Sequence, residues 1–296
     1  MKSQLDLHGK TAFITGGSGG LGSAIAESLA LRGAHITLFS RRQGPLDQAR
    51  AHLSSRCPDP EQEINAFAVD LGDAVQVDHA FRSQSRIPDL LYCTAGGNHA
   101  ENGFFADIPA GALEGCMRNN YFSSAFAAKA ALDIWLEDDK RGTRGREEEK
   151  KVRKIIFISS AAAFVCLPGS VAYSPDFVSP GFLAEQKTKT ALTKRIQGLD
   201  APPSELVSRF PTSEKVASLI IAAVDRGDFT ICEDSPAASA LFTAMTGPSP
   251  KRGWGIADGL LSIVVNWFVW PFLRWKWEGM VKDDAKTAGR GESSVT

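Results

Sequence analysis

Short apolar runs alternate with longer amphipathic stretches over most of the chain. The runs have the length and flanking turn residues of buried strands, and the stretches between them place apolar residues at helical spacing. Strands are expected at residues 10–15, 35–40, 64–69, 89–93, 154–159 and 228–232. Helices are expected at residues 21–29, 46–53, 111–136 and 211–225. This alternation is typical of an α/β fold with a doubly wound parallel sheet.

A glycine-rich loop joins the first strand to the first helix, which Gly33 is expected to end. Glycines let the backbone approach a diphosphate, and the helix N-terminus offers N–H groups and the positive end of a dipole. The spacing Thr-Gly-x-x-x-Gly-x-Gly therefore favours nucleotide binding over a plain structural turn. The candidate residues of this loop are Thr15, Gly16, Ser18, Gly19, Gly20, Leu21 and Gly22.

Two arginines follow the second strand. Ser40 ends that strand, and Arg41 and Arg42 stand where NAD enzymes usually carry a carboxylate for the ribose 2′-hydroxyl. Two cations without a carboxylate favour a 2′-phosphate, and hence NADP(H), over a pair of solvated surface arginines.

Further candidates follow the third and fourth strands. Asp70, which precedes Leu71, is expected either to cap the next helix or to hydrogen-bond an adenine amino group. Ala95 and Gly96 are small enough to let a nucleotide lie against the end of the fourth strand. These positions complete the candidate cofactor site.

Composition narrows the possible partners and compartments. The chain has 296 residues and a formal net charge of −1, which gives no electrostatic reason to expect a nucleic acid partner. Its five scattered cysteines predict reduced thiols in a protein that faces the cytosol, and its histidines do not cluster as metal ligands do. The polar N-terminus does not resemble a signal peptide. Residues 138–154 are rich in both charges and are expected to form a solvated loop.

The C-terminal part combines tryptophans with an uncharged run. Residues 259–273 carry no charge, but they are fewer than the roughly 20 that a spanning helix needs, and Pro271 is expected to limit the helix further. The tryptophans and nearby cations suit a membrane–water interface, so we expect membrane docking or a re-entrant anchor. The alternative is a buried or dimer-forming helix. The expected divisions are a nucleotide-binding domain at 1–250, a membrane-associated segment at 251–281 and a polar, disordered tail at 282–296.

Two hydroxyl groups carry the candidate chemistry. Ser160 lies at the end of the fifth strand, and Tyr173 follows 13 residues later. A tyrosine can protonate a ketone oxygen while hydride arrives at the carbon, provided that a nearby cation lowers its pKa.

With these residues the chain resembles the short-chain dehydrogenase/reductase family over roughly its first 175 residues. The matching positions are the glycine motif, Asp70, Thr94-Ala95-Gly96, Asn120, Ser160 and Tyr173. The resemblance implies a Rossmann-type fold and a nicotinamide cofactor. It also implies Tyr173 as general acid, Ser160 as a support for the carbonyl oxygen and Asn120 as the holder of a proton-relay water.

Within the family the chain resembles fungal reductases of a long-chain sphingoid ketone. The features are Arg41-Arg42, residues 93–97, residues 119–122, residues 172–175 and residues 179–189. This resemblance implies NADPH-dependent reduction of 3-ketosphinganine to sphinganine at the cytoplasmic face of the endoplasmic reticulum membrane. It does not decide between a monomer and a homo-oligomer.

One departure from the family pattern bears on activity. The pattern is Tyr-x-x-x-Lys, whereas Phe177 stands four residues after Tyr173. Only seven residues separate Tyr173 from Gly181, although a crossover helix and strand need about 25–30 residues. We therefore expect that the segment with the catalytic lysine is absent, that ketone reduction is weak or absent, and that a strand edge and apolar surface are exposed. The alternatives are a mis-spliced form, a non-catalytic NADP-binding relic and a reductase of another lipid ketone.

Overall fold

The computed structural model describes residues 5–97, 108–142, 152–159, 211–228 and 256–287, with short pieces at 191, 194–195, 199–202, 205 and 231. Ser160, Tyr173 and the expected gap between Tyr173 and Gly181 lie outside the described residues.

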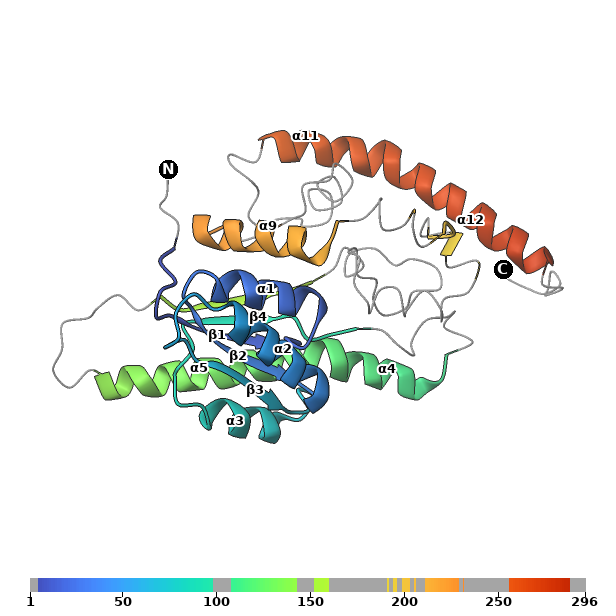
Figure 1. Cartoon of the computed structure of the whole chain (residues 1–296). Coiled ribbons are helices and arrows are strands. Elements are labelled where there is room, and N and C mark those ends of the chain that lie inside the picture. The colour runs from blue at the N-terminus through green and yellow to red at the C-terminus, as the bar shows by residue number, and fades with distance from the viewer. Residues whose placement is uncertain are drawn as a thin grey trace.

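Five parallel strands form one sheet in the order β3-β2-β1-β4-β5 (Figure 1). They are β1 (Thr11–Thr15), β2 (His35–Ser40), β3 (Ile64–Ala68), β4 (Leu90–Cys93) and β5 (Lys154–Phe157). The order runs outward from β1 in both directions, so the predicted doubly wound sheet is confirmed. Thr15 is in register with Phe39 of β2 and with Cys93 of β4, so these strands end together at one edge.

Helices connect the strands, and each of the predicted helices is present. The elements are α1 (Gly20–Ala30), α2 (Gln43–Arg56), α3 (Ala74–Arg82), α4 (Ala110–Cys116), the π-helical turn η1 (Met117–Phe122), α5 (Ser123–Gly142), α9 (Ser213–Arg226), α11 (Ile256–Val264), the π-helical turn η3 (Val265–Val269) and α12 (Trp270–Thr287).

The sheet is covered on both faces. Helices α1, α2 and α9 pack on one face, and α3 and α5 pack on the other, which gives three layers (Figure 1). Successive strand residues point to opposite faces, so Ile14 joins the first core cluster and Phe13 joins the second. Burial on both sides explains why β1, β2 and β4 are mostly apolar runs in the sequence.

β5 is an edge strand in the described part of the sheet. It pairs with β4, and its residue Phe157 keeps 58% of its surface exposed.

Two expectations for the charge-dense stretch and the last strand need correction. Residues 138–142 continue α5 instead of forming a loop, because the side chains of Asp138 and Asp139 both pair with Arg153, at 2.5 and 2.7 Å. In the strand expected at 228–232, Asp228 and Ile231 are described and neither is in a strand.

Two expectations for the C-terminal helix are also wrong. Pro271 does not end it, because the π turn η3 precedes the proline and the Trp270 N–H bonds to the Val265 carbonyl, five residues back. A wider turn relieves the clash that a proline ring makes with the preceding turn. The polar residues from Lys282 to Thr287 are helical rather than part of a disordered tail.

Candidate functional site

The loop between β1 and α1 is built from glycines that the packing requires. Gly16 has a φ of +71°, and a Cβ there would lie 2.9 Å from the backbone of Ala95. A Cβ on Gly22 would lie 2.5 Å from the Thr94 hydroxyl oxygen and 2.6 Å from the Gly16 carbonyl oxygen. The loop therefore lies tightly against the segment that follows β4.

The N-terminus of α1 has room for an anion. No side chain caps this helix, and its first turn carries no acidic residue. A Cβ built on Gly19, the N-cap residue, would meet no atom within 4 Å. Uncapped N–H groups that face open space fit the diphosphate of a dinucleotide cofactor.

Thr15 and Thr94 fasten the ends of β1 and β4 to each other. The Thr15 hydroxyl oxygen accepts hydrogen bonds from the N–H groups of Thr94, at 3.1 Å, and Ala95, at 3.2 Å. The Thr94 hydroxyl donates a short hydrogen bond to the Thr15 carbonyl. This pair holds Ala95 beside Gly16 of the glycine loop.

The segment after β2 carries two arginines. Among the described residues, neither Arg41 nor Arg42 forms an ion pair, and Arg41 donates a hydrogen bond of 3.3 Å to the Asn119 side-chain oxygen. The Ser18 hydroxyl donates to the Ser40 hydroxyl at 3.0 Å, which joins the glycine loop to the end of β2. The positive charge therefore lies beside the loop that fits a diphosphate.

Asp70 does not cap the next helix, so that alternative is wrong. The N-cap of α3 is Asp73, which accepts from the N–H groups of Val75 and Gln76. Hydrogen bonds from Gln76, first from its backbone N–H, hold the pKa of Asp73 below its ordinary value. Asp70 instead forms a 3.0 Å ion pair with Arg118 of η1. Leu71, the neighbouring candidate, is buried in the core.

Asn120 joins η1 to the segment after β4. Its side-chain oxygen accepts from the Gly97 N–H at 2.9 Å, and its amide nitrogen donates to the carbonyls of Gly97 and Cys116. The Ser123 hydroxyl likewise donates to the Asn119 carbonyl, four residues back. Side chains that occupy i−4 carbonyls compete with the helical backbone, which explains the wider π turn.

Neither Tyr92 nor Lys154 is placed to act as a proton donor at this site. Burial raises the pKa of Tyr92 well above its ordinary value, and Tyr92 lies in the core under α1 and α9. Lys154 is at the start of β5, on the side of the sheet opposite to the glycine loop. Its ammonium group donates a hydrogen bond to the Val224 carbonyl. The roles predicted for Ser160 and Tyr173 stay predictions, because both residues lie outside the described part of the chain.

Sequence reasoning missed Arg118 and did not assign a role to Asn119. The available signal was the run of three polar residues at 118–120 in a predicted helix. An α-helix directs consecutive side chains to different sides, so these three can contact different segments.

The chain is similar to known oxidoreductases. Residues 10–175 match the short chain dehydrogenase family. A PIGF/3-ketodihydrosphingosine reductase fusion protein of Schizosaccharomyces pombe is 27% identical, with 96% of this chain and 59% of that protein covered. The 3-ketodihydrosphingosine reductase ksrA of Aspergillus fumigatus is 26% identical, with 76% and 71% covered. The 3-dehydrosphinganine reductase of Danio rerio is 27% identical, with 88% and 81% covered.

Solved structures share the fold. The crystal structure of levodione reductase matches with a TM-score of 0.59 at 16% identity, over 76% of this chain and 94% of that one. A short chain dehydrogenase/reductase from Burkholderia phymatum in complex with NAD matches with a TM-score of 0.56 at 18% identity, over 77% and 89%.

Proposed function

The chain belongs to the short chain dehydrogenase family, and from that premise we propose that it is a reductase of the 3-ketosphinganine type that uses NADPH. Its fungal and vertebrate relatives that carry the name 3-ketodihydrosphingosine or 3-dehydrosphinganine reductase support this substrate class. The chain spans 59% of the fission yeast fusion protein and 66–81% of several other relatives.

The observation that carries the cofactor assignment is the charge beside the glycine loop. Arg41 and Arg42 follow β2 without a carboxylate partner in the described part of the chain, and the uncapped end of α1 faces open space. These features support a dinucleotide with a 2′-phosphate. When bound, NADPH would supply the hydride for ketone reduction.

The residues proposed for proton transfer are Tyr173, Ser160 and Asn120. A phenol donates its proton near neutral pH only if positive charge stabilises the phenolate. Phe177 occupies the position of the family lysine that gives this support. We therefore expect cofactor binding together with weak or absent turnover.

The experiment that tests this function measures NADPH binding and NADPH oxidation separately. The purified chain should bind NADPH more tightly than NADH and should oxidise NADPH slowly or not at all with 3-ketosphinganine. Normal turnover would contradict the expected loss of the lysine segment. Tight NADPH binding with no turnover on any lipid ketone would favour the non-catalytic alternative, and a lack of NADPH binding would overturn the proposal.

The C-terminal helix supports docking on the surface of the endoplasmic reticulum membrane, with the reductase domain on the cytoplasmic side. The exposed apolar side chains recur along α11, η3 and α12 at helical spacing, and they are Leu260, Ile263, Val264, Trp267, Phe268, Val269, Phe272 and Trp275. Trp267, Phe268 and Trp275 each keep at least 70% of their surface exposed. Within the described residues, no helix is both long and apolar enough to cross a bilayer. An aromatic face flanked by Arg274 and Lys276 suits insertion into the headgroup region, where a long-chain ketone would be collected.

Docking can be tested by flotation with phosphatidylcholine vesicles that contain anionic lipid. Replacing Trp267, Phe268 and Trp275 by serine should lower vesicle binding by about 100-fold, because each ring buries a large apolar area on insertion. The matched control replaces Leu132 and Leu136 of α5, which are 45% and 48% exposed, by serine and should bind as the wild type does. Undiminished flotation of the triple variant would overturn the docking proposal.

A further inference from the structure

Three consecutive residues of η1 reach three different segments at the carboxyl edge of the sheet, which is the side where the parallel strands end. Arg118 pairs with Asp70 after β3, and Asn119 accepts from Arg41 after β2. Asn120 bonds to Gly97 after β4. One π turn therefore touches every segment to which we assign cofactor contacts, apart from the glycine loop.

The contact between Asn119 and Arg41 orients a cation without neutralising it. The acceptor is a neutral amide oxygen, 3.3 Å from the Arg41 Nη1, so the guanidinium keeps its full charge and its remaining N–H donors. An arginine that is held in place loses less freedom when it binds a phosphate. Asn119 thereby prepares Arg41 for an anion.

The contact between Arg118 and Asp70 removes a competing negative charge. β2 and β3 are neighbours, so the Asp70 carboxylate follows a strand about 4.8 Å from the one that ends beside Arg41. The Arg118 guanidinium lies 3.0 Å from that carboxylate, and Gly72 leaves the space for its side chain, since a Cβ there would lie 2.5 Å from the Arg118 Cγ. The pair is partly exposed and is therefore weak as a stabilising contact, but it cancels a repulsion.

We propose that Asn119 is a positioning residue for Arg41 and that Arg118 is a specificity residue, and that together they make the site select a cofactor with a phosphate on the ribose 2′-oxygen. This inference rests on the proposed function and assigns its cofactor preference to residues of η1.

The test is a set of dissociation constants, measured with the full chain for NADPH, NADH, adenosine 2′,5′-bisphosphate and 5′-AMP. Asn119→Ala should weaken binding of the two 2′-phosphorylated ligands by about threefold to tenfold and leave the other two unchanged. Asn119→Asp should weaken it by about tenfold to 100-fold, because a carboxylate neutralises Arg41. Arg118→Gln should weaken it by about threefold to tenfold, because Asp70 then repels the phosphate.

Two controls separate positioning from a general effect on folding. Ser54→Asp adds the same charge as Asn119→Asp at an exposed position near the end of α2, at the opposite edge, and should leave all four constants unchanged. In an Arg41→Ala background, Asn119→Ala should cause no further loss, because the group that it positions is absent. Thermal unfolding of each variant checks that the fold is retained.

The outcomes distinguish this inference from the proposed function. A wild-type chain that binds NADPH and NADH equally, or binds neither, overturns both. A wild-type chain that prefers NADPH, combined with variants at Asn119 and Arg118 that keep the same preference, overturns the inference alone. Equal losses for phosphorylated and unphosphorylated ligands also overturn it, because they indicate a merely structural role.

Discussion

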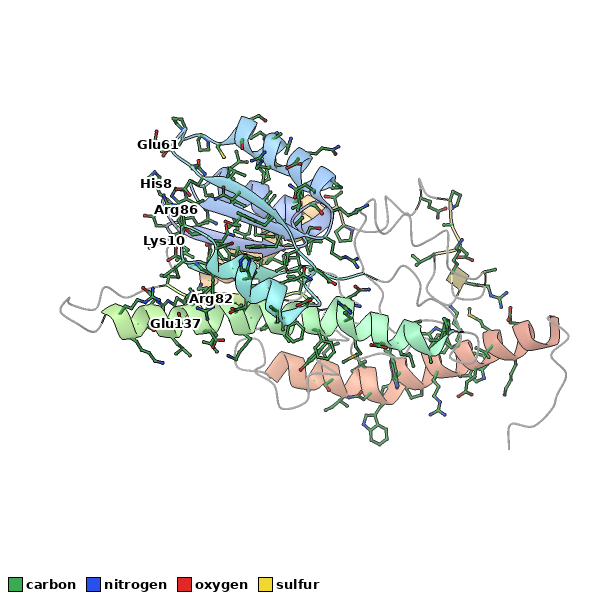
Figure 2. All side chains as sticks on the ribbon, turned by 90° about the horizontal axis from the view of Figure 1, so that it is seen from below. His8, Lys10, Glu61, Arg82, Arg86 and Glu137 are labelled. Atoms are coloured by element: carbon green, nitrogen blue, oxygen red, sulfur yellow. The ribbon has the colours of Figure 1, made fainter. Side chains whose placement is uncertain are left out.

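The strands begin at one side of the sheet, the amino edge, and end at the other, the carboxyl edge. Charged side chains have different partners at these two edges. Figure 2 shows His8, Lys10, Glu61, Arg82, Arg86 and Glu137 gathered at the amino edge. Here cations meet carboxylates: Arg86 pairs with Glu63 at 2.7 Å, and Arg82 pairs with Glu137 at 2.9 Å. At the carboxyl edge, Arg41 lacks a carboxylate partner among the described residues. The charged side chains at the amino edge thus stabilise the fold, whereas the carboxyl edge has such a pair between Arg118 and Asp70 and leaves Arg41 available for a ligand.

The largest expected effect comes from breaking a mostly buried ion pair on the amino side. Arg32 at the end of α1 forms a two-pronged pair with Asp225 of α9, at 3.1 and 3.2 Å, and both side chains are mostly buried. Asp225→Ala leaves the guanidinium without its carboxylate and should lower the free energy of unfolding by about 2–4 kcal/mol. Urea unfolding measures this loss.

The same variant tests whether the two edges are independent. Under conditions where Asp225→Ala is folded, its dissociation constant for NADPH should equal that of the wild type. Asp228→Ala removes an exposed pair with Arg226 and should change the free energy of unfolding by less than about 0.5 kcal/mol. If either variant changed the affinity for NADPH without a loss of stability, the two edges would not be independent.

The next effect concerns glycines, where packing and ligand binding meet. Gly22→Ala forces a methyl group against the Thr94 hydroxyl and the Gly16 carbonyl, so it should cost about 1–3 kcal/mol of folding stability. Gly19→Ala has open space and an extended φ of 174°, so its stability should stay within about 0.5 kcal/mol of the wild type. Chemical unfolding of the two variants side by side checks this contrast, and equal losses would contradict the tight contact at Gly22.

A third effect should appear in binding and not in stability. Arg42 has no ion-pair partner among the described residues, so Arg42→Ala should leave the unfolding free energy unchanged. It should weaken NADPH binding by about tenfold and leave NADH binding unaltered. Arg50→Ala in α2, the helix that Arg42 precedes, is the control, because the 4.0 Å contact of Arg50 with Asp47 is weak and exposed. A stability loss in Arg42→Ala would assign this arginine to the fold.

The sequence predicts the centre of the sheet well because β1, β2 and β4 are buried on both faces. The expected run 35–40 coincides with β2, and the run 10–15 differs from β1 by one residue. The glycine loop is equally readable, since Gly16 and Gly22 are required by contacts that no larger residue fits. Local patterns suffice where backbone geometry and burial dictate the residue type.

Prediction was less successful where distant side chains decide the structure. Asp70 was one expected helix cap, but its carboxylate pairs with Arg118, and Asp73 caps α3 instead. The end of α5 depended on Arg153, which lies near the far end of the charge-rich segment 138–154 and pairs with Asp138 and Asp139 at its start. Neither contact is visible in local periodicity, because each joins residues far apart in the chain.

The smallest expected effect is a pH dependence that belongs to the amino edge. The His35 Nδ1 accepts the Glu63 N–H at 3.0 Å, so the imidazole must be neutral there. Burial, with Arg86 second, lowers the pKa of His35 below its ordinary value of 6.5. The unfolded chain therefore binds the proton more readily, and this contribution to stability is lost as the pH falls from about 7 through the folded-state pKa.

The unfolding temperature of the wild type should fall by about 1–2 °C between pH 7 and pH 5 through this group, since solvent screens a partly exposed imidazole. His35→Gln keeps an acceptor that does not titrate and should flatten the decline, whereas His79→Gln on the exposed side of α3 should follow the wild type. NADPH affinity should be unchanged in both variants, because neither histidine lies at the carboxyl edge. If the unfolding temperature of His35→Gln still fell with pH as in the wild type, other groups would carry the pH dependence. Altered NADPH affinity would show that the two edges are coupled.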